Sequence, residues 1–438
     1  MGTDPAARRA AEQAGDRDSD GDGDGAGMRP WRFVVWFGIV SLLADFVYEG
    51  ARSVTGPLLA SLGASATLVG VVTGAGEAAA LVPRLLSGPL ADRTGRFWAL
   101  AIGGYALTVA AVPLLGVAGS LGAACTLVIA ERVGKAVRSP AKDTLLSHAT
   151  AATGRGRGFA VHEALDQVGA VIGPLTVAAV LAATGGYGPA LGVLAAPGVA
   201  ALGLLWWLRS RVPDPSRYES APPARPRATQ APAPAQALAS ASAPSPSPAP
   251  VRRPLPRAFW AYAAFTAATM TGFTTYGVLS FHLVRHHLLT ASAVPVLYAG
   301  TMLAGALASL VTGWLYDRIG PRTLVALPVL AAAVPPLGFA DAVAPAVAGA
   351  LLWGAALGVQ ESTLRAVVAD LVPAPRRATA YGVFAAVVGL ATLAGGALTG
   401  ALSAVSVPAL VVTVAAVQAA ALVLLATVRP GRGRVTPG

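Results

Sequence analysis

The chain contains 438 residues, of which 55% are hydrophobic and 12% charged, and its formal net charge is +11. Soluble domains carry roughly 25% charged residues, so this composition excludes an ordinary soluble domain and predicts a membrane protein. A basic chain can also bind nucleic acid, but the basic residues here lie in short stretches between apolar segments, where the positive-inside rule explains them. The single cysteine, Cys125, excludes a disulfide framework within the chain. We therefore expect the lipid bilayer, and no nucleic acid, as a partner.

Apolar segments long enough to cross a membrane follow one another along most of the chain. A spanning helix needs about 20 apolar residues, and the sequence predicts twelve such helices in two bundles of six, at 30–210 and 257–428. The predicted spans are 31–60, 66–90, 97–117, 120–139, 157–183, 187–209, 257–286, 292–316, 323–340, 343–370, 376–402 and 405–428. The predicted fold class is therefore an all-α membrane protein.

Polar segments precede, separate and follow the two predicted bundles. Residues 1–29 are rich in Ala, Gly and Asp and are predicted to form a disordered tail, with Met28 as an alternative start. Residues 211–256 form a Pro/Ala/Ser-rich linker that has no apolar face to bury. Residues 429–438 form a short C-terminal tail.

The connectors between predicted spans differ in charge on the two sides of the membrane. Every second connector carries Lys or Arg, as at Arg93, Lys142 and Arg376, whereas the others nearly lack them, with Arg285 as the exception. By the positive-inside rule, both tails and the linker face the cytoplasm. We expect a multi-pass protein of the plasma (inner) membrane.

A short charged motif occurs at matched positions of the two halves. Gly88-Pro-Leu-Ala-Asp-Arg-Thr-Gly-Arg96 follows the second predicted span, and Gly313-Trp-Leu-Tyr-Asp-Arg-Ile-Gly-Pro-Arg322 follows the eighth. Two such hairpins at the water boundary indicate two similar halves, and in transporters built this way the substrate site lies near the midplane between the repeats. The residues of the two copies are Gly88, Asp92, Arg93, Gly95, Arg96, Gly313, Asp317, Arg318, Gly320 and Arg322.

With twelve predicted spans, the duplicated motif resembles the signature of the major facilitator superfamily (MFS), over about residues 30–428. The resemblance implies the MFS fold, two six-helix bundles around a central cavity, and transport by alternating access. Asp92 and Asp317 then become candidates for a conformational gate, in which a carboxylate meets the positive N-terminus of a helix from the opposite half. A turn carboxylate that only caps its own hairpin is the alternative.

Two further stretches resemble motifs of the same family. Glu131-Arg-Val-Gly-Lys-Ala-Val-Arg138 resembles the Arg-and-Gly motif associated with proton coupling. Gly169-Ala-Val-Ile-Gly173-Pro174 resembles the helix-packing core of the antiporter motif, although Val177 replaces an expected glycine. The resemblance implies a bacterial efflux-type protein.

Ionisable residues at mid-depth are concentrated in the first half. Asp45, Glu49 and Arg52 share one face of the first span, at positions i, i+4 and i+7. Because a charge at the bilayer centre costs at least about 2.5–3.5 kcal/mol, their number predicts either a polar cavity with proton coupling or buried ion pairs that lock helices together. The predicted network is Asp45, Glu49, Arg52, Glu77, Glu131, Arg132, Lys135, His162 and Asp166.

Asp45 is the first candidate for the proton-binding carboxylate, followed by Asp166 and Glu49. Arg52 and Arg138, the outer members of their helices, are expected to extend toward an interface. The second half carries few charges and offers an apolar wall for substrate. The substrate-binding candidates are Gln167, Phe273, Tyr276, Trp353, Gln360 and Glu361.

No metal site is predicted. His282, His286 and His287 stand close together beside Arg285, but the sequence shows no fixed partner for them. There is also no P-loop, which excludes ATP-driven transport by this chain alone, and no nucleophile–base signature of an enzyme. We expect no cofactor, a proton gradient as the energy source, and a monomer.

The expected function is secondary active transport of a small organic compound by alternating access, as proton-coupled efflux. A proton-linked importer of a sugar, organic acid or other metabolite is the first alternative. A receptor or scaffold on a transporter fold, acting through the 211–256 linker, is the second.

Overall fold

The computed structural model describes residues 28–153, 155–218, 255–373 and 376–427, and within these ranges the chain is helical and contains no strand. The predicted all-α fold is therefore confirmed for this part of the chain. Nearly all of the two predicted tails and most of the predicted linker lie outside it. The first residues of that linker are an exception, since Pro215–Tyr218 form a 3-10 helix, and the Tyr218 hydroxyl donates to the Met28 carbonyl oxygen at 2.7 Å.

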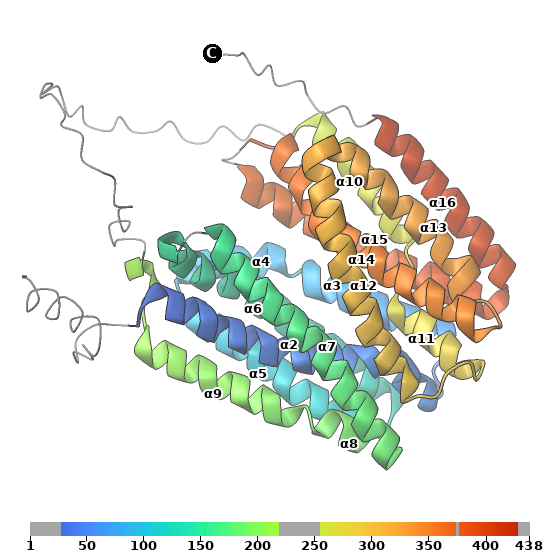
Figure 1. The fold of residues 1–438 in the computed structure, drawn as a ribbon, viewed down its shortest axis with the longest axis horizontal. Helices are drawn as coiled ribbons and strands as arrows, with labels where there is room; N and C mark the ends of the chain where they lie inside the picture. Colours follow the sequence, from blue (N-terminus) through green and yellow to red (C-terminus); the bar gives the residue numbers. More distant parts are fainter. Residues whose placement is uncertain (1–27, 154, 219–254, 374–375, 428–438) are drawn as a thin grey trace, which may run out of the picture.

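The helices form two consecutive groups (Figure 1). The first half contains α2 (Pro30–Ser61), α3 (Ala66–Leu81), α4 (Arg84–Thr94), α5 (Phe97–Gly116), α6 (Leu121–Thr153), α7 (Arg155–Thr184), α8 (Tyr187–Gly192), α9 (Ala195–Arg211) and η1 (Pro215–Tyr218). The second half contains α10 (Arg257–Thr271), α11 (Tyr276–Arg285), α12 (Ala293–Ile319), η2 (Gly320–Val325), α13 (Ala326–Gly338), α14 (Val343–Leu371), α15 (Arg377–Val405) and α16 (Val407–Thr427).

Nine helical segments of the described chain are long and apolar enough to cross a membrane. One of them, 293–338, combines α12 with α13, and two other predicted spans fall outside the nine. These are the charge-rich α6 and the pair formed by α10 and α11, which are only 15 and 10 residues long. Large apolar side chains along α12, such as Leu303, Leu307 and Leu310, are more than half exposed, which suits a lipid-facing surface.

Three predicted spans are interrupted. The sixth breaks at Val193 and Leu194, between α8 and α9, and the other two breaks have a local cause. The second span breaks at Val82 and Pro83 between α3 and α4, because proline lacks the N–H that would continue the helix. The seventh span breaks after Gly272, and Thr275 then caps α11 by accepting a hydrogen bond from the Val278 N–H. The fourth span is longer than predicted, since α6 continues to Thr153.

A polar layer divides the apolar core of the first half. One cluster, which includes Phe33, Phe37 and Trp98, lies toward the start of α2, and a second, which includes Val54 and Leu115, lies toward its end. Along α2, Asp45 falls between these clusters, and Glu49 and Arg52 lie among the first residues of the second cluster. The second half has one larger core. The predicted charge asymmetry between the halves is thus also an asymmetry of packing.

The two halves meet at one end of the molecule and diverge at the other (Figure 1). We call the end that carries Pro30 and Thr427 the termini side, and the end that carries the α7–α8 and α11–α12 connections the far side. At the far side α11 lies against α2, where a Cβ on Gly56 would overlap the Gly277 carbonyl oxygen. The Thr73 and Thr275 hydroxyls join α3 to the start of α11 at 2.8 Å. Toward the termini side, α4 and α6 point away from α10 and α13.

Small residues allow α3 and α15 to pack with their backbones in contact. A Cβ on Gly70 would overlap the Gly396 carbonyl oxygen, and one on Gly74 would lie 2.9 Å from the Leu393 Cα. Glycines at such a contact let two membrane helices approach closely. Since α3 and α15 belong to different halves, this contact is part of the interface between them.

We expect Gly70→Val to lower the thermal midpoint of the purified protein, because the added methyl groups push α3 from α15 at a cost of about 1–3 kcal/mol. Gly103→Val on α5 is the matched control, since a Cβ there meets no atom within 4 Å. Intrinsic tryptophan fluorescence in detergent would report both midpoints. Equal midpoints for the two variants would contradict the close packing of α3 against α15.

Candidate substrate cavity and charge network

A small cavity lies between the two halves, with a volume of about 60 Å³, enough for a few water molecules. Both halves contribute to its wall. Its lining includes Arg52, Thr73, Glu77 and Arg132 from the first half and Phe273, Thr274, Tyr276, Trp353 and Gln360 from the second. The Thr274 hydroxyl and the side-chain amide oxygen of Gln360 have no hydrogen-bond partner among the described residues. The cavity therefore offers charged, polar and aromatic groups together.

Glu77 is the centre of an ion-pair chain along one wall of the cavity. Its Oε1 lies 2.9 Å from Arg52 Nη2 on α2 and 3.4 Å from Arg132 Nη1 on α6. Arg52 also lies 3.7 Å from Glu49, and Arg132 lies 3.2 Å from Glu131. Five predicted network residues thus form one continuous chain across three helices of the first half.

One hydrogen bond extends this chain into the second half. The Tyr298 hydroxyl on α12 donates to Glu49 Oε2, and both residues are buried. Glu49 is therefore bound by Arg52 from its own helix and by Tyr298 from the opposite half. Nothing in the sequence around Tyr298 marked it as part of the network.

Aromatic rings hold two further basic residues of α6. Lys135 Nζ lies 3.7 Å from the centre of the Tyr48 ring, and the Arg138 guanidinium lies 4.7 Å from the centre of the Tyr105 ring. Arg138 also donates to the Thr108 hydroxyl at 2.9 Å and is only 3% exposed. The expectation that Arg138 extends to an interface is therefore wrong, because cation–π contacts and a hydrogen bond stabilise its guanidinium inside the bundle.

The same expectation is wrong for Arg52, which points inward to Glu77. Its side chain is 16% exposed, and the two carboxylates beside it offset the cost of keeping a guanidinium away from water. Arg52 is therefore part of the cavity wall.

A second group of charges lies nearer the termini side. Asp166 Oδ2 on α7 lies 3.7 Å from Lys142 Nζ on α6 and 3.9 Å from His162 Nε2, and the Ser41 hydroxyl lies 3.3 Å from the same His162 nitrogen. Asp45 interacts electrostatically with Asp166 and Lys142, and with Lys135 and Arg138 on α6. Lys142 was predicted in a connector, but the length of α6 places it here.

The predicted substrate-binding residues separate into two sets. Phe273, Tyr276, Trp353 and Gln360 line the cavity. Gln167 and Glu361 do not line it. Gln167 donates to Glu163 one turn away on α7 at 3.3 Å, and the exposed Glu361 on α14 interacts electrostatically with Arg52. Within the wall, the Trp353 indole N–H donates to the Thr274 carbonyl oxygen at 2.7 Å and fixes the ring.

The two copies of the charged motif end α4 and α12 on the termini side. Gly95 and Gly320 have φ angles of 62° and 63°, which glycine adopts without strain. Asp92 and Asp317 are exposed, and no hydrogen bond or ion pair to either side chain is found within the described ranges. The proposed contact with the opposite half is therefore not made in this conformation, in which the termini-side ends diverge.

The antiporter-like stretch packs α7 onto α2. A Cβ on Gly169 would overlap the Leu42 carbonyl oxygen, and one on Gly173 would overlap that of Phe46. Pro174, next to Gly173, is also buried. This close contact fixes α7 against the helix that carries Asp45 and Glu49.

Comparison with known proteins establishes the family. The sequence profile of the Major Facilitator Superfamily matches residues 37–302 and 261–438. The chain belongs to the major facilitator superfamily. It is therefore a multi-pass membrane protein of a transporter family, as the duplicated motif predicted.

Individual relatives agree with this assignment. An uncharacterized protein of Mycobacterium tuberculosis (strain H37Rv) is 61% identical over 405 residues, which cover 91% of this chain and 93% of the relative. An uncharacterized MFS-type transporter of Methanocaldococcus jannaschii is 24% identical over 385 residues, covering 85% and 89%.

Solved structures show the same fold at low sequence identity. The nucleoside transporter NupG matches with a TM-score of 0.64 at 12% identity, covering 90% of this chain and 98% of that one. A bacterial homologue of the human lysosomal transporter Spinster, inward-facing and unoccupied, matches with a TM-score of 0.61 at 15% identity, covering 92% and 96%. The predicted MFS fold is thereby confirmed.

Proposed function

We propose that the protein is a secondary active transporter that exports a small organic compound by alternating access, in exchange for protons. The observation that carries this proposal is the position of Glu49, which binds Arg52 in its own half and Tyr298 in the other. A carboxylate held in this way couples its own charge to the contact between the halves.

Proton uptake by Glu49 would weaken both interactions together. Hydrogen bonds and ion pairs to an ionised carboxylate are stronger than those to a neutral acid. Loss of the negative charge therefore favours separation of α2 from α12, and loss of the proton favours the far-side contact seen here. Asp45 and Asp166 remain candidates for a second proton site. Like Glu49, each of these carboxylates interacts with a basic side chain: Asp166 with Lys142, and Asp45 with Lys135 and Lys142.

The composition of the cavity supports an organic substrate with an apolar or aromatic part and a polar or charged group. Phe273 and Trp353 offer parallel rings 6.1 Å apart, and Glu77 and Arg132 offer both signs of charge opposite them. The present volume admits only a few waters, so binding requires the halves to part further on one side. Export is the proposed direction because of the antiporter-like packing of α7 on α2.

Transport in proteoliposomes with an imposed pH gradient tests the proposal. We expect the purified protein to move protons when a compound from a metabolite and drug panel is supplied on the termini side, and Glu49→Gln to reduce this flux to the background of empty vesicles. Asp45→Asn and Asp166→Asn assign the remaining candidates in the same assay. Asp370→Asn is the control, since this exposed acid binds Tyr316 within the second half and lies outside the network.

The outcomes separate the alternatives. Cargo that moves with protons instead of against them would favour the importer. Proton flux that is the same in Glu49→Gln, Asp45→Asn and wild type would contradict coupling through these charges.

A further inference from the structure

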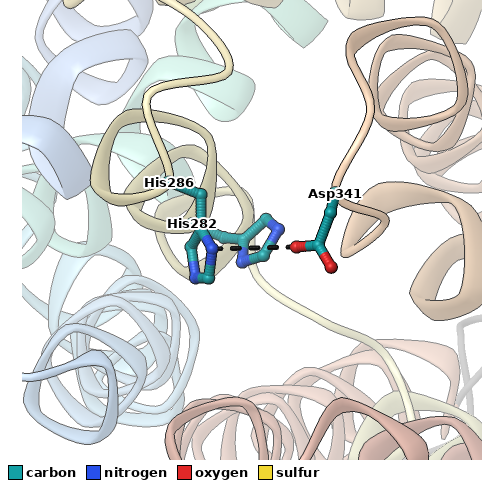
Figure 2. A group of neighbouring side chains, drawn as sticks. All are labelled: His282, His286 and Asp341. Atoms are coloured by element: carbon teal, nitrogen blue, oxygen red, sulfur yellow. Dashed lines mark ion pairs between the residues drawn. The ribbon is translucent and has the colours of Figure 1, made fainter.

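Three side chains of metal-ligating type gather at the far side, outside the cavity. His282 lies in the last turn of α11, His286 directly follows that helix, and Asp341 lies in the connection between α13 and α14 (Figure 2). Their ligand atoms all lie within 4.8 Å of one another, and His286 Nδ1 is 3.8 Å from Asp341 Oδ1. The sequence showed no fixed partner for these histidines, and the fold supplies Asp341.

His282 is already oriented as a ligand. Its side chain is 5% exposed, its ring hydrogen-bonds to the backbone of Ala340, and it packs on the Phe339 ring at 5.0 Å between centres. Its Nε2 is buried and has no hydrogen-bond partner among the described residues. Metal-bound histidines commonly donate their other ring N–H to a backbone carbonyl, which fixes the tautomer and aims the free nitrogen at the ion.

We propose that His282, His286 and Asp341 bind a divalent transition-metal ion, with Zn²⁺ as the best fit. Two imidazole nitrogens and one carboxylate are a common zinc donor set that leaves a fourth position for water. Calcium and magnesium prefer sites made of oxygen ligands alone, so the two nitrogens disfavour them.

The geometry requires only a small adjustment. Zinc bonds of about 2.0–2.1 Å place neighbouring tetrahedral ligands about 3.4 Å apart. The side chains of His286 and Asp341 are 50% and 90% exposed, so they are free to rotate toward the fixed His282. The three ligands come from one half, and the ion would join the far-side end of α11 to the α13–α14 connection. Because α11 also packs on Gly56 of α2, the ion would stabilise the helix that closes the far side.

Zinc titration of the full-length protein in detergent tests this site, with the protein purified without a polyhistidine tag. Isothermal titration calorimetry and metal analysis after gel filtration should give one Zn²⁺ per chain. We expect His286→Ala and Asp341→Ala to weaken binding by at least about tenfold, since even supporting residues of metal sites contribute 10–100-fold. Both residues are exposed, so both variants should fold, which their thermal midpoints without metal would verify.

His287→Ala is the matched control, because this exposed neighbour lies outside the group. Its binding should equal that of wild type, and Zn²⁺ should raise the thermal midpoint of both proteins but not of Asp341→Ala. The proposal would be overturned by the absence of saturable Zn²⁺ binding to the wild type. Equal binding by wild type and Asp341→Ala would also overturn it, as would loss of binding in His287→Ala.

Discussion

Arg132→Gln is expected to lower the free energy of unfolding by about 3–5 kcal/mol, the usual cost of removing one partner from a buried ion pair. Arg132 lies between Glu77 and Glu131 and is 6% exposed. Without Arg132, Glu131 would lose its ion pair with that residue, and Glu77 would keep only its ion pair with Arg52. The thermal midpoint in detergent and the unfolding curve in dodecyl sulfate would both measure the loss.

A double-mutant cycle separates the ion pair from the packing of the arginine stem. Glu77→Gln with Arg132→Gln removes opposite charges together, so we expect the double variant to lose less stability than the two single variants added. Arg209→Gln is the control for an exposed arginine and should change stability by no more than about 0.5 kcal/mol. Additive losses in the cycle would show that Glu77 and Arg132 are not coupled.

Tyr298→Phe is expected to shift the protein toward a conformation with the far side open. The variant removes the bond between Tyr298 and Glu49 and keeps the ring. A hydrogen bond to a charged group contributes about 1.5–3 kcal/mol, so the shift in population should be roughly 10- to 100-fold. Spin labels at Thr184 and Thr290, exposed residues at the far side of opposite halves, should report longer distances in a Cys125→Ser background.

Acidity should act in the same direction as the substitution. Protonation of Glu49 removes the charge on which the Tyr298 bond depends, so lower pH should lengthen the Thr184–Thr290 distance in the wild type. Tyr298→Phe and Glu49→Gln should respond less to pH, because they lack this bond or this charge. Tyr262→Phe is the control, since its hydroxyl bonds to the Leu364 carbonyl oxygen inside the second half. The coupling would be refuted if Tyr262→Phe moved the distance as much as Tyr298→Phe.

Both tests depend on interactions that the sequence indicated only in part. The i, i+4, i+7 spacing placed Asp45, Glu49 and Arg52 on one face of a helix, because that relation follows from helical geometry alone. The spacing did not show whether Arg52 would turn outward or toward Glu77, since that choice depends on the neighbouring helix. The same limit explains Arg138, which two tyrosine rings and Thr108 hold inside the bundle.

The sequence by itself determined the membrane environment, the two similar halves and the family, because hydropathy and the duplicated Gly88–Arg96 motif are properties of the chain order. Only the tertiary structure decided which charges meet. Glu49 and Tyr298 are 249 residues apart in sequence, and Asp341 reaches His286 from another connection. Such pairs depend on the rotation and register of packed helices. Close backbone contacts fix both, as where Gly169 of α7 packs on the backbone of α2. Local periodicity carries no information about them.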